Sequence, residues 1–233
     1  MELLETWAMM RLMSGGIEIV LFDVGGPIYD DGVYAAALLE GLQELGADAD
    51  EGAFRREYER CRSAQAGFTR PLAARFGVDG GLLAAAAAAR WRYPPEALHA
   101  DVLPTLARLA PRYRIGVLAN QPQTTRAALE RDGVAAYVGV WIISEEVGLA
   151  KPDPRIFAHA VATAGCAAGR AAFVGNRLDN DIRPAGAAGL RTVWLLRGEA
   201  PVSPTPSQLA EADVAIPSLD RLRDALERIA AVP

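Results

Sequence analysis

Asp23 is the residue of this chain whose position most favours chemistry. It follows the apolar run of residues 17–22, whose β-branched and aromatic side chains indicate a buried strand. It precedes the glycines at positions 25 and 26, which allow a sharp turn and a close approach of the backbone to a ligand. Because ligands bind at the carboxyl ends of the strands in open parallel α/β sheets, the Asp23 carboxylate is a candidate functional group.

Further polar side chains follow other predicted strands in the same way. Carboxyl ends of parallel strands meet at one edge of a sheet, so we expect these side chains to converge on Asp23. They are Asn120 after residues 114–118, Lys151 beyond residues 138–143, and Asn176, Asp179 and Asp181 after residues 171–174. Asp153, which lies between two prolines in the Lys151 loop, is expected to have a structural role and to orient that loop.

Strand-like and helical patterns alternate between residues 114 and 196. Helical patterns over residues 124–131, 154–164 and 181–188 separate the strands, the last of which spans residues 192–196. This alternation predicts right-handed βαβ units and an α/β fold with a doubly wound, Rossmann-like parallel sheet. A final helix over residues 218–229, with Ser218 as its cap, should cover one face of that sheet.

Residues 32–98 follow a different pattern that is almost entirely helical. The segment contains an uninterrupted alanine run and no convincing strand, and glycine and proline divide it into four or so helices. We therefore expect an all-helical cap domain over residues 32–98, inserted into a core domain of residues 17–31 and 99–233. Residues 1–16 are expected to form a poorly ordered leader.

Composition limits the class of partner. The 24 basic and 29 acidic residues give a net charge of -5, which provides no general attraction to nucleic acid or anionic membranes. No apolar stretch reaches the ~20 residues of a transmembrane helix, and no signal-peptide pattern is present. Cys61 and Cys166 lie far apart, as is typical of a reducing compartment. We expect a cytoplasmic protein with a small-molecule substrate; the sequence does not set its oligomeric state.

Four stretches of the chain together carry a family resemblance. In their order and intervals they resemble the motifs of the haloacid dehalogenase (HAD) superfamily, specifically the C1 members with a helical cap after the first motif. The resemblance covers about residues 17–230 and implies a HAD-like hydrolase. The matching stretches are residues 20–26, 116–120, 148–157 and 173–181.

The resemblance implies a covalent mechanism. Asp23 matches the nucleophile, which attacks phosphorus or carbon to form an aspartyl intermediate that water hydrolyses. Lys151 matches the catalytic lysine, which offsets the repulsion between that carboxylate and a phosphoryl group. Gly26, Asn120 and Lys151 are the implied phosphate-binding residues.

The resemblance also implies Mg²⁺ as cofactor. The ion would be held by Asp23, the backbone carbonyl of Gly25, Asn176 and Asp181, because Mg²⁺ takes oxygen ligands. Gly25 and Asn176 stand where phosphatases of the family usually have aspartates, so Mg²⁺ binding should be weak. Ala119 stands where a serine or threonine is usual.

These departures leave three functions open. The first is a phosphatase of a small phosphorylated metabolite, in which substrate or cap supplies the acid that Gly25 lacks. The second is a 2-haloacid dehalogenase, whose halide leaves without a proton; those enzymes, however, usually carry an aromatic residue at position 25 and a serine in the second motif. The third is a catalytically impaired module that keeps the fold for binding.

Overall fold

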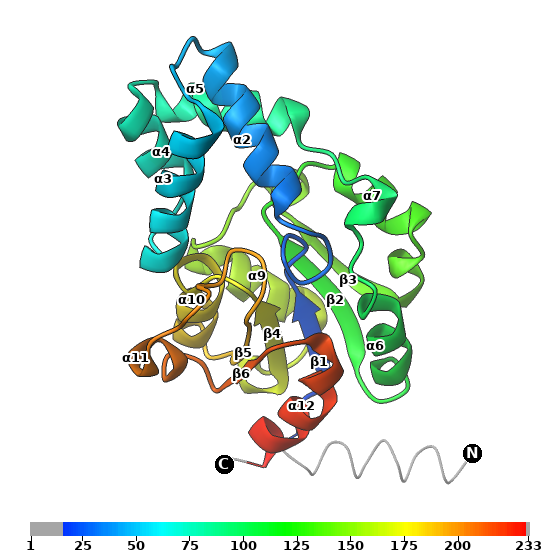
Figure 1. Ribbon diagram of the computed structural model, residues 1–233. Helices are drawn as coiled ribbons and strands as arrows, with labels where there is room; N and C mark the ends of the chain where they lie inside the picture. Colours follow the sequence, from blue (N-terminus) through cyan, green and yellow to red (C-terminus); the bar gives the residue numbers. More distant parts are fainter. Residues whose placement is uncertain (1–15, 232–233) are drawn as a thin grey trace, which may run out of the picture.

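A six-stranded parallel sheet forms the centre of the computed structural model, which describes residues 16–231 (Figure 1). The predicted leader therefore lies outside the described residues, apart from Gly16. The strand order is β3-β2-β1-β4-β5-β6, which confirms the predicted doubly wound sheet. The strands are β1 (Ile19–Phe22), β2 (Arg114–Ala119), β3 (Val138–Ile143), β4 (Ala171–Gly175), β5 (Arg191–Leu195) and β6 (Val214–Ile216). The edge strand β6, with three residues, was not predicted.

The strand β1 occupies the middle of the sheet and pairs with β2 on one side and β4 on the other. The chain first winds outward through β2 and β3, then crosses back to continue through β4, β5 and β6. The winding therefore reverses between β1 and β4, which is the position where ligands bind in folds of this kind. Asp23 and Asn176 directly follow these two strands.

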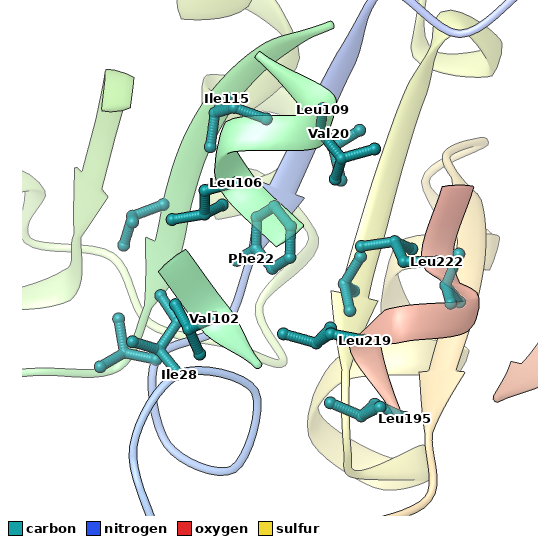
Figure 2. Close-up of a cluster of buried hydrophobic side chains, with 14 of the residues drawn as sticks. Val20, Phe22, Ile28, Val102, Leu106, Leu109, Ile115, Leu195, Leu219 and Leu222 are labelled. Atoms are coloured by element: carbon teal, nitrogen blue, oxygen red, sulfur yellow. The ribbon is translucent and has the colours of Figure 1, made fainter. Parts of the chain in front are cut away.

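Helices cover both faces of the sheet. The strand residues Val20 and Phe22 point into the hydrophobic cluster of Figure 2, together with Leu106 and Leu222. Ile19 and its alternating neighbours point into the cluster on the opposite face. The first face is covered by α6 (Val102–Leu109), α7 (Thr124–Arg131) and α12 (Leu222–Ala230), and the second by α9 (Pro154–Ala164) and α10 (Arg183–Ala187). Burial of these two apolar faces holds the strand ends in place.

Two predicted helices differ in detail from the structure. The pattern over residues 181–188 becomes a π-helix, Leu178–Ile182, that leads directly into α10. The last helix begins as a 3-10 turn, Leu219–Arg221, and the Ser218 side chain makes no cap bond. The Asp101 carboxylate instead accepts the Leu219 amide hydrogen at 3.1 Å. A residue distant in sequence thus replaces the predicted local cap.

Short elements complete the core. They are two short α-helices, α8 (Ser144–Val147) and α11 (Pro206–Leu209), and the 3-10 helices Pro95–Ala97, Val134–Tyr137 and Ala168–Arg170.

The helices predicted between the first two strands are present. They pack around a hydrophobic cluster of their own that includes Leu38, Phe54, Leu72 and Leu83. In Figure 1 they lie beyond the carboxyl ends of the strands. We call them the four-helix unit: α2 (Gly32–Glu44), α3 (Glu51–Ala64), α4 (Thr69–Phe76) and α5 (Gly80–Arg90).

Within residues 16–231, no single helix is long and apolar enough to cross a membrane. Among the described residues, α4 and α5 taken together are the one helix pair that reaches the required length and composition, and this pair is bent by 116°.

Candidate active site

A buried lysine joins two carboxylates at the carboxyl edge of the sheet. The Lys151 Nζ lies 2.9 Å from Asp23 Oδ1 and 2.6 Å from Asp181 Oδ1, and the lysine side chain has no exposed surface. The structure therefore brings together three residues that are up to 158 positions apart in sequence (181 − 23). The predicted nucleophile and the predicted catalytic lysine are in direct contact.

The site keeps its central charges in a buried setting. Burial raises the pKa of Asp23 to about 6, with a further rise from Asp181 and an opposing effect from Lys151. For Lys151, burial lowers the pKa, but the two carboxylates outweigh it and hold the pKa above its usual value. At neutral pH a negative carboxylate therefore faces a positive ammonium group.

Asn120 positions Lys151 through the main chain. Its Nδ2 donates to the Lys151 carbonyl at 2.8 Å, and its Oδ1 accepts the Lys151 amide hydrogen at 2.7 Å. Both ends of the amide are thus engaged by the lysine loop, and its predicted contact with substrate stays a prediction. Asp153 begins α9 and accepts the Arg155 amide hydrogen at 2.9 Å, which is the structural role expected for it.

Asp181 reaches the site because the chain turns tightly after β4. Its Oδ2 accepts the amide hydrogens of Asn176 at 3.2 Å and Arg177 at 3.0 Å. An ideal Cβ at Gly175 would lie 2.4 Å from the Asp181 Cβ, so only glycine fits there. The π-helix that produces this turn has no local sequence signal that we recognised.

Gly26 allows the loop after β1 to pack against the loop after β4. Its φ of +82° favours glycine, and a Cβ there would lie 2.1 Å from Asn176 Nδ2. The Gly26 amide donates to the Tyr29 carbonyl at 2.7 Å. Its main-chain donor is therefore used within the loop, and the implied phosphate contact of Gly26 stays a prediction.

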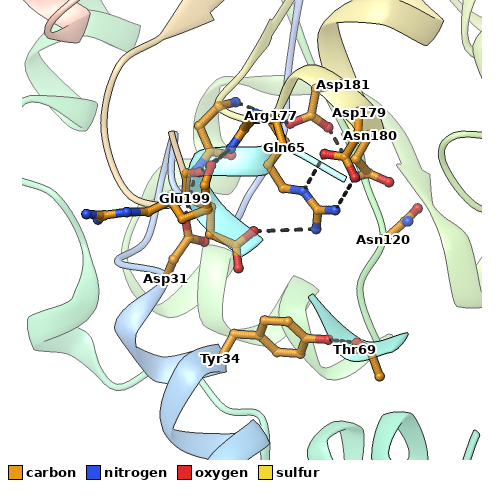
Figure 3. Close-up of polar contacts among 12 residues, drawn as sticks. Asp31, Tyr34, Gln65, Thr69, Asn120, Arg177, Asp179, Asn180, Asp181 and Glu199 are labelled. Carbon is orange, nitrogen blue, oxygen red and sulfur yellow. Dashed lines mark hydrogen bonds and ion pairs between the residues drawn. The ribbon is translucent and has the colours of Figure 1, made fainter. Parts of the chain in front are cut away.

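Two acidic residues at the site were not among the sequence-based candidates (Figure 3). Asp31 is 7% exposed, and its Oδ2 accepts hydrogen bonds from Asn176 Nδ2 at 2.7 Å and from the Glu199 amide at 3.0 Å. Burial, followed by the Glu199 charge, raises the pKa of Asp31 well above its usual range. Glu199 itself accepts from Tyr58 of α3 at 2.8 Å and lies 3.4 Å from the Arg177 guanidinium. In the sequence, Asp31 resembles an ordinary helix cap and Glu199 an ordinary loop residue.

The donor set gives a test of the implied Mg²⁺ site. Both Asp181 oxygens already accept hydrogen bonds, from Lys151 and from main-chain amides. Asn176 donates its nitrogen to Asp31 and offers a metal only a neutral amide oxygen. Between residues 16 and 231, no group of three or more histidine, cysteine or acidic side chains is arranged to hold a metal ion. These residues do not fit a tightly held resident Mg²⁺.

Comparison with known proteins places the chain in a family. Residues 17–189 match the family model of the haloacid dehalogenase-like hydrolases. The chain belongs to this family. The fold comparison agrees: the HAD-hydrolase YfnB of Bacillus subtilis superposes with a TM-score of 0.68 at 19% identity, covering 91% of this chain and 99% of that one.

The sequence relatives of this HAD-like hydrolase include phosphatases. A glyceraldehyde 3-phosphate phosphatase of Methanopyrus kandleri is 31% identical over 201 residues, which cover 78% of this chain and 85% of that enzyme. A phosphoserine phosphatase of Thermus thermophilus is 38% identical over 120 residues, 51% of this chain. That second match spans only 47% of the relative's length.

Proposed function

We propose that this HAD-like hydrolase is a phosphatase of small phosphorylated metabolites, with Asp23 as its nucleophile. The observation that carries the proposal is the contact of the buried Lys151 ammonium with Asp23 at 2.9 Å. A lysine held in this way offsets the repulsion between the carboxylate and an approaching phosphoryl group. The phosphatase relatives support the same reaction class.

The proposed reaction has two steps. An Asp23 oxygen forms a bond to phosphorus while the ester P–O bond breaks and its electron pair goes to the leaving oxygen. Water then attacks the phosphorus of the aspartyl phosphate, which releases inorganic phosphate and restores the carboxylate. Lys151 stays charged through both steps because Asp181 holds its ammonium group from the other side.

The four-helix unit would serve as a cap that selects the substrate. It contributes Tyr58 and Gln65, which contact Glu199 and Leu178 of the core beside the site. Since Asp23 is only 8% exposed, a substrate must be small or must enter while the unit is displaced.

Phosphatases of this family generally depend on Mg²⁺. For this chain we propose weak binding to the free protein, because the donor set leaves few carboxylate oxygens unengaged. Assays should therefore be run with Mg²⁺ in excess and with a chelator.

A panel of phosphate esters tests the proposal. The unmodified protein should hydrolyse at least one small phosphorylated metabolite, and Asp23→Asn should reduce turnover to background while the circular dichroism spectrum stays unchanged. Asp48→Asn, at an exposed site in the four-helix unit, is the matched control and should keep full activity.

The same panel separates the two alternatives. Asp23-dependent halide release from 2-haloacids, with no phosphate release, would identify a dehalogenase. Absence of Asp23-dependent turnover from both kinds of compound would refute the enzyme proposal and favour a binding module.

A further inference from the structure

The Asp31 carboxyl group fills the space that a side chain at position 25 would need. An ideal Cβ on Gly25 would lie 2.8 Å from Asp31 Oδ1. Asp31 Oδ2 would lie 2.8 Å from a Cβ on Gly26 and 2.3 Å from one on Gly198. Three glycines from two separate loops therefore make room for this one buried carboxyl group.

Hydrogen bonds hold the group in that space. Asn176 Nδ2, at 2.7 Å, and the Glu199 amide, at 3.0 Å, both donate to its Oδ2. The oxygen nearer to Gly25 is Oδ1. Asp31 stands at the N-cap of α2, yet its side chain makes no cap bond to that helix. The carboxyl group is directed to the site and does not serve its own helix.

Asp31 also accounts for the amide at position 176. A carboxyl group that is buried needs a donor, and the Asn176 amide nitrogen supplies one. An aspartate at position 176 would instead place two buried carboxylates at hydrogen-bond distance, where like charges repel. In the sequence, Gly25 and Asn176 are two unrelated replacements of a family aspartate. In the structure both fit the Asp31 carboxyl group: Gly25 leaves it space, and Asn176 donates a hydrogen bond to it.

We propose that Asp31 replaces the acid missing from position 25 and contacts the leaving oxygen of the substrate. This inference rests on the proposed phosphatase function. As the ester P–O bond breaks, the Asp31 carboxyl gives its proton to the leaving oxygen, so that an alcohol departs and a carboxylate remains. That carboxylate then takes a proton from the water that attacks the aspartyl phosphate, which restores the acid.

The dependence of the hydrolysis rate on the leaving group distinguishes a catalytic role of Asp31 from a purely structural one. An alkyl alcohol needs a proton to leave, whereas 4-nitrophenolate needs little help. Asp31→Asn should reduce kcat/KM for glycerol 2-phosphate by about 10²–10⁴-fold and change kcat/KM for 4-nitrophenyl phosphate only slightly, because kcat/KM reports the first step, in which the leaving group departs. Asp30→Asn is the matched control, because Asp30 is the exposed neighbour that bonds the Gly32 amide at 2.9 Å. It should alter neither rate.

A relocation experiment provides a second test that does not depend on the folding of Asp31→Asn. Gly25→Asp alone should be hindered by the 2.8 Å approach to Asp31 Oδ1. Gly25→Asp combined with Asp31→Gly removes that contact and returns the acid to position 25. The double variant should cleave glycerol 2-phosphate much faster than Asp31→Gly alone.

The outcomes distinguish the two proposals. An equal loss of kcat/KM on both substrates, or no loss on either, together with no gain in the double variant, would overturn the role of Asp31 while leaving an Asp23-dependent phosphatase. If the unmodified protein shows no Asp23-dependent phosphatase activity, the proposed function fails and the role of Asp31 fails with it.

Discussion

At the scale of single residues, the site depends on charges that are buried together. Lys151 has carboxylates on two sides, and Asp31 has an amide nitrogen and a main-chain amide on one oxygen. Each buried charge or carboxyl group thus has a partner, as the cost of desolvation requires. The free energy of this arrangement is sensitive to the protonation of Asp23, whose pKa burial raises to about 6.

We predict that phosphatase activity rises with pH through about 6, because only the ionised form of Asp23 is a nucleophile. The effect of pH on the stability of the fold has the opposite direction. The folded protein holds this proton more tightly than the unfolded chain, so the contribution of Asp23 to stability falls as pH rises from 3.8 to about 6. The check is the pH dependence of kcat/KM for 4-nitrophenyl phosphate, with Asp23→Asn as the background. A rate that stays constant down to pH 4 would contradict the prediction.

At the scale of elements, side chains from one loop hold other loops in place at the ends of the strands. The Arg197 guanidinium bonds the Gly26 and Pro27 carbonyls and pairs with Asp101 at 2.8 Å. Asp101 in turn accepts the Leu219 amide hydrogen at the start of the last helix. The glycine loop after β1 is therefore fixed by the loop after β5.

The end of α3 is joined to the core by Gln65. Its backbone is left-handed, with φ of +49°, and its side chain bonds the Glu199 carbonyl at 2.7 Å and the Leu178 amide at 2.8 Å. We predict that Gln65→Ala lowers the free energy of unfolding by roughly 1–3 kcal/mol, because the buried Leu178 amide loses its acceptor. Urea unfolding would measure the loss. Gln43→Ala, which removes one longer bond of 3.3 Å within the four-helix unit, should cost less; an equal loss would argue against this role of Gln65.

At the scale of the whole molecule, the site lies where the four-helix unit meets the carboxyl edge of the sheet. The unit is held there by polar contacts, among them Tyr58 to Glu199 at 2.8 Å and Arg62 to the Gly198 carbonyl at 3.4 Å. Its hydrophobic cluster meets that of the core at Trp91, which packs against both. Polar contacts with so small a shared apolar contact are easier to open than one continuous core.

We predict that the free protein spends part of its time with the four-helix unit displaced, because Asp23 is only 8% exposed when the unit is in contact with the core. Orthovanadate, which mimics a phosphoryl group, should shift the population toward molecules in which the four-helix unit contacts the core. Small-angle scattering should then give a radius of gyration near the ~17 Å of a compact chain of this length with vanadate, and a larger one without it. Asp23→Asn should not respond to vanadate. Equal radii for the unmodified protein in both conditions would refute the prediction.

Local patterns were sufficient for the main architecture. The helices over residues 124–131 and 154–164, and the strand over residues 138–143, lie where the sequence predicted them, because each buries a periodic apolar face. The short edge strand β6 and the π-helix before α10 were missed. Pairing of a three-residue strand with β5, and a turn tight enough to return Asp181 to the site, depend on neighbours that no local window contains.

The sequence by itself determined the fold class, the family resemblance and the identity of Asp23 and Lys151 as partners, since ordered motifs at strand ends must meet at one edge of a parallel sheet. Only the tertiary structure decided that Asp31 enters the same site. The carboxyl group reaches it across the space left by Gly25, Gly26 and Gly198, and an Asn176 amide faces it. Spatial complementarity between residues far apart in the chain leaves no periodic signal, so in the sequence Gly25 and Asn176 stood out only as departures from the family motifs and Asp31 did not stand out at all.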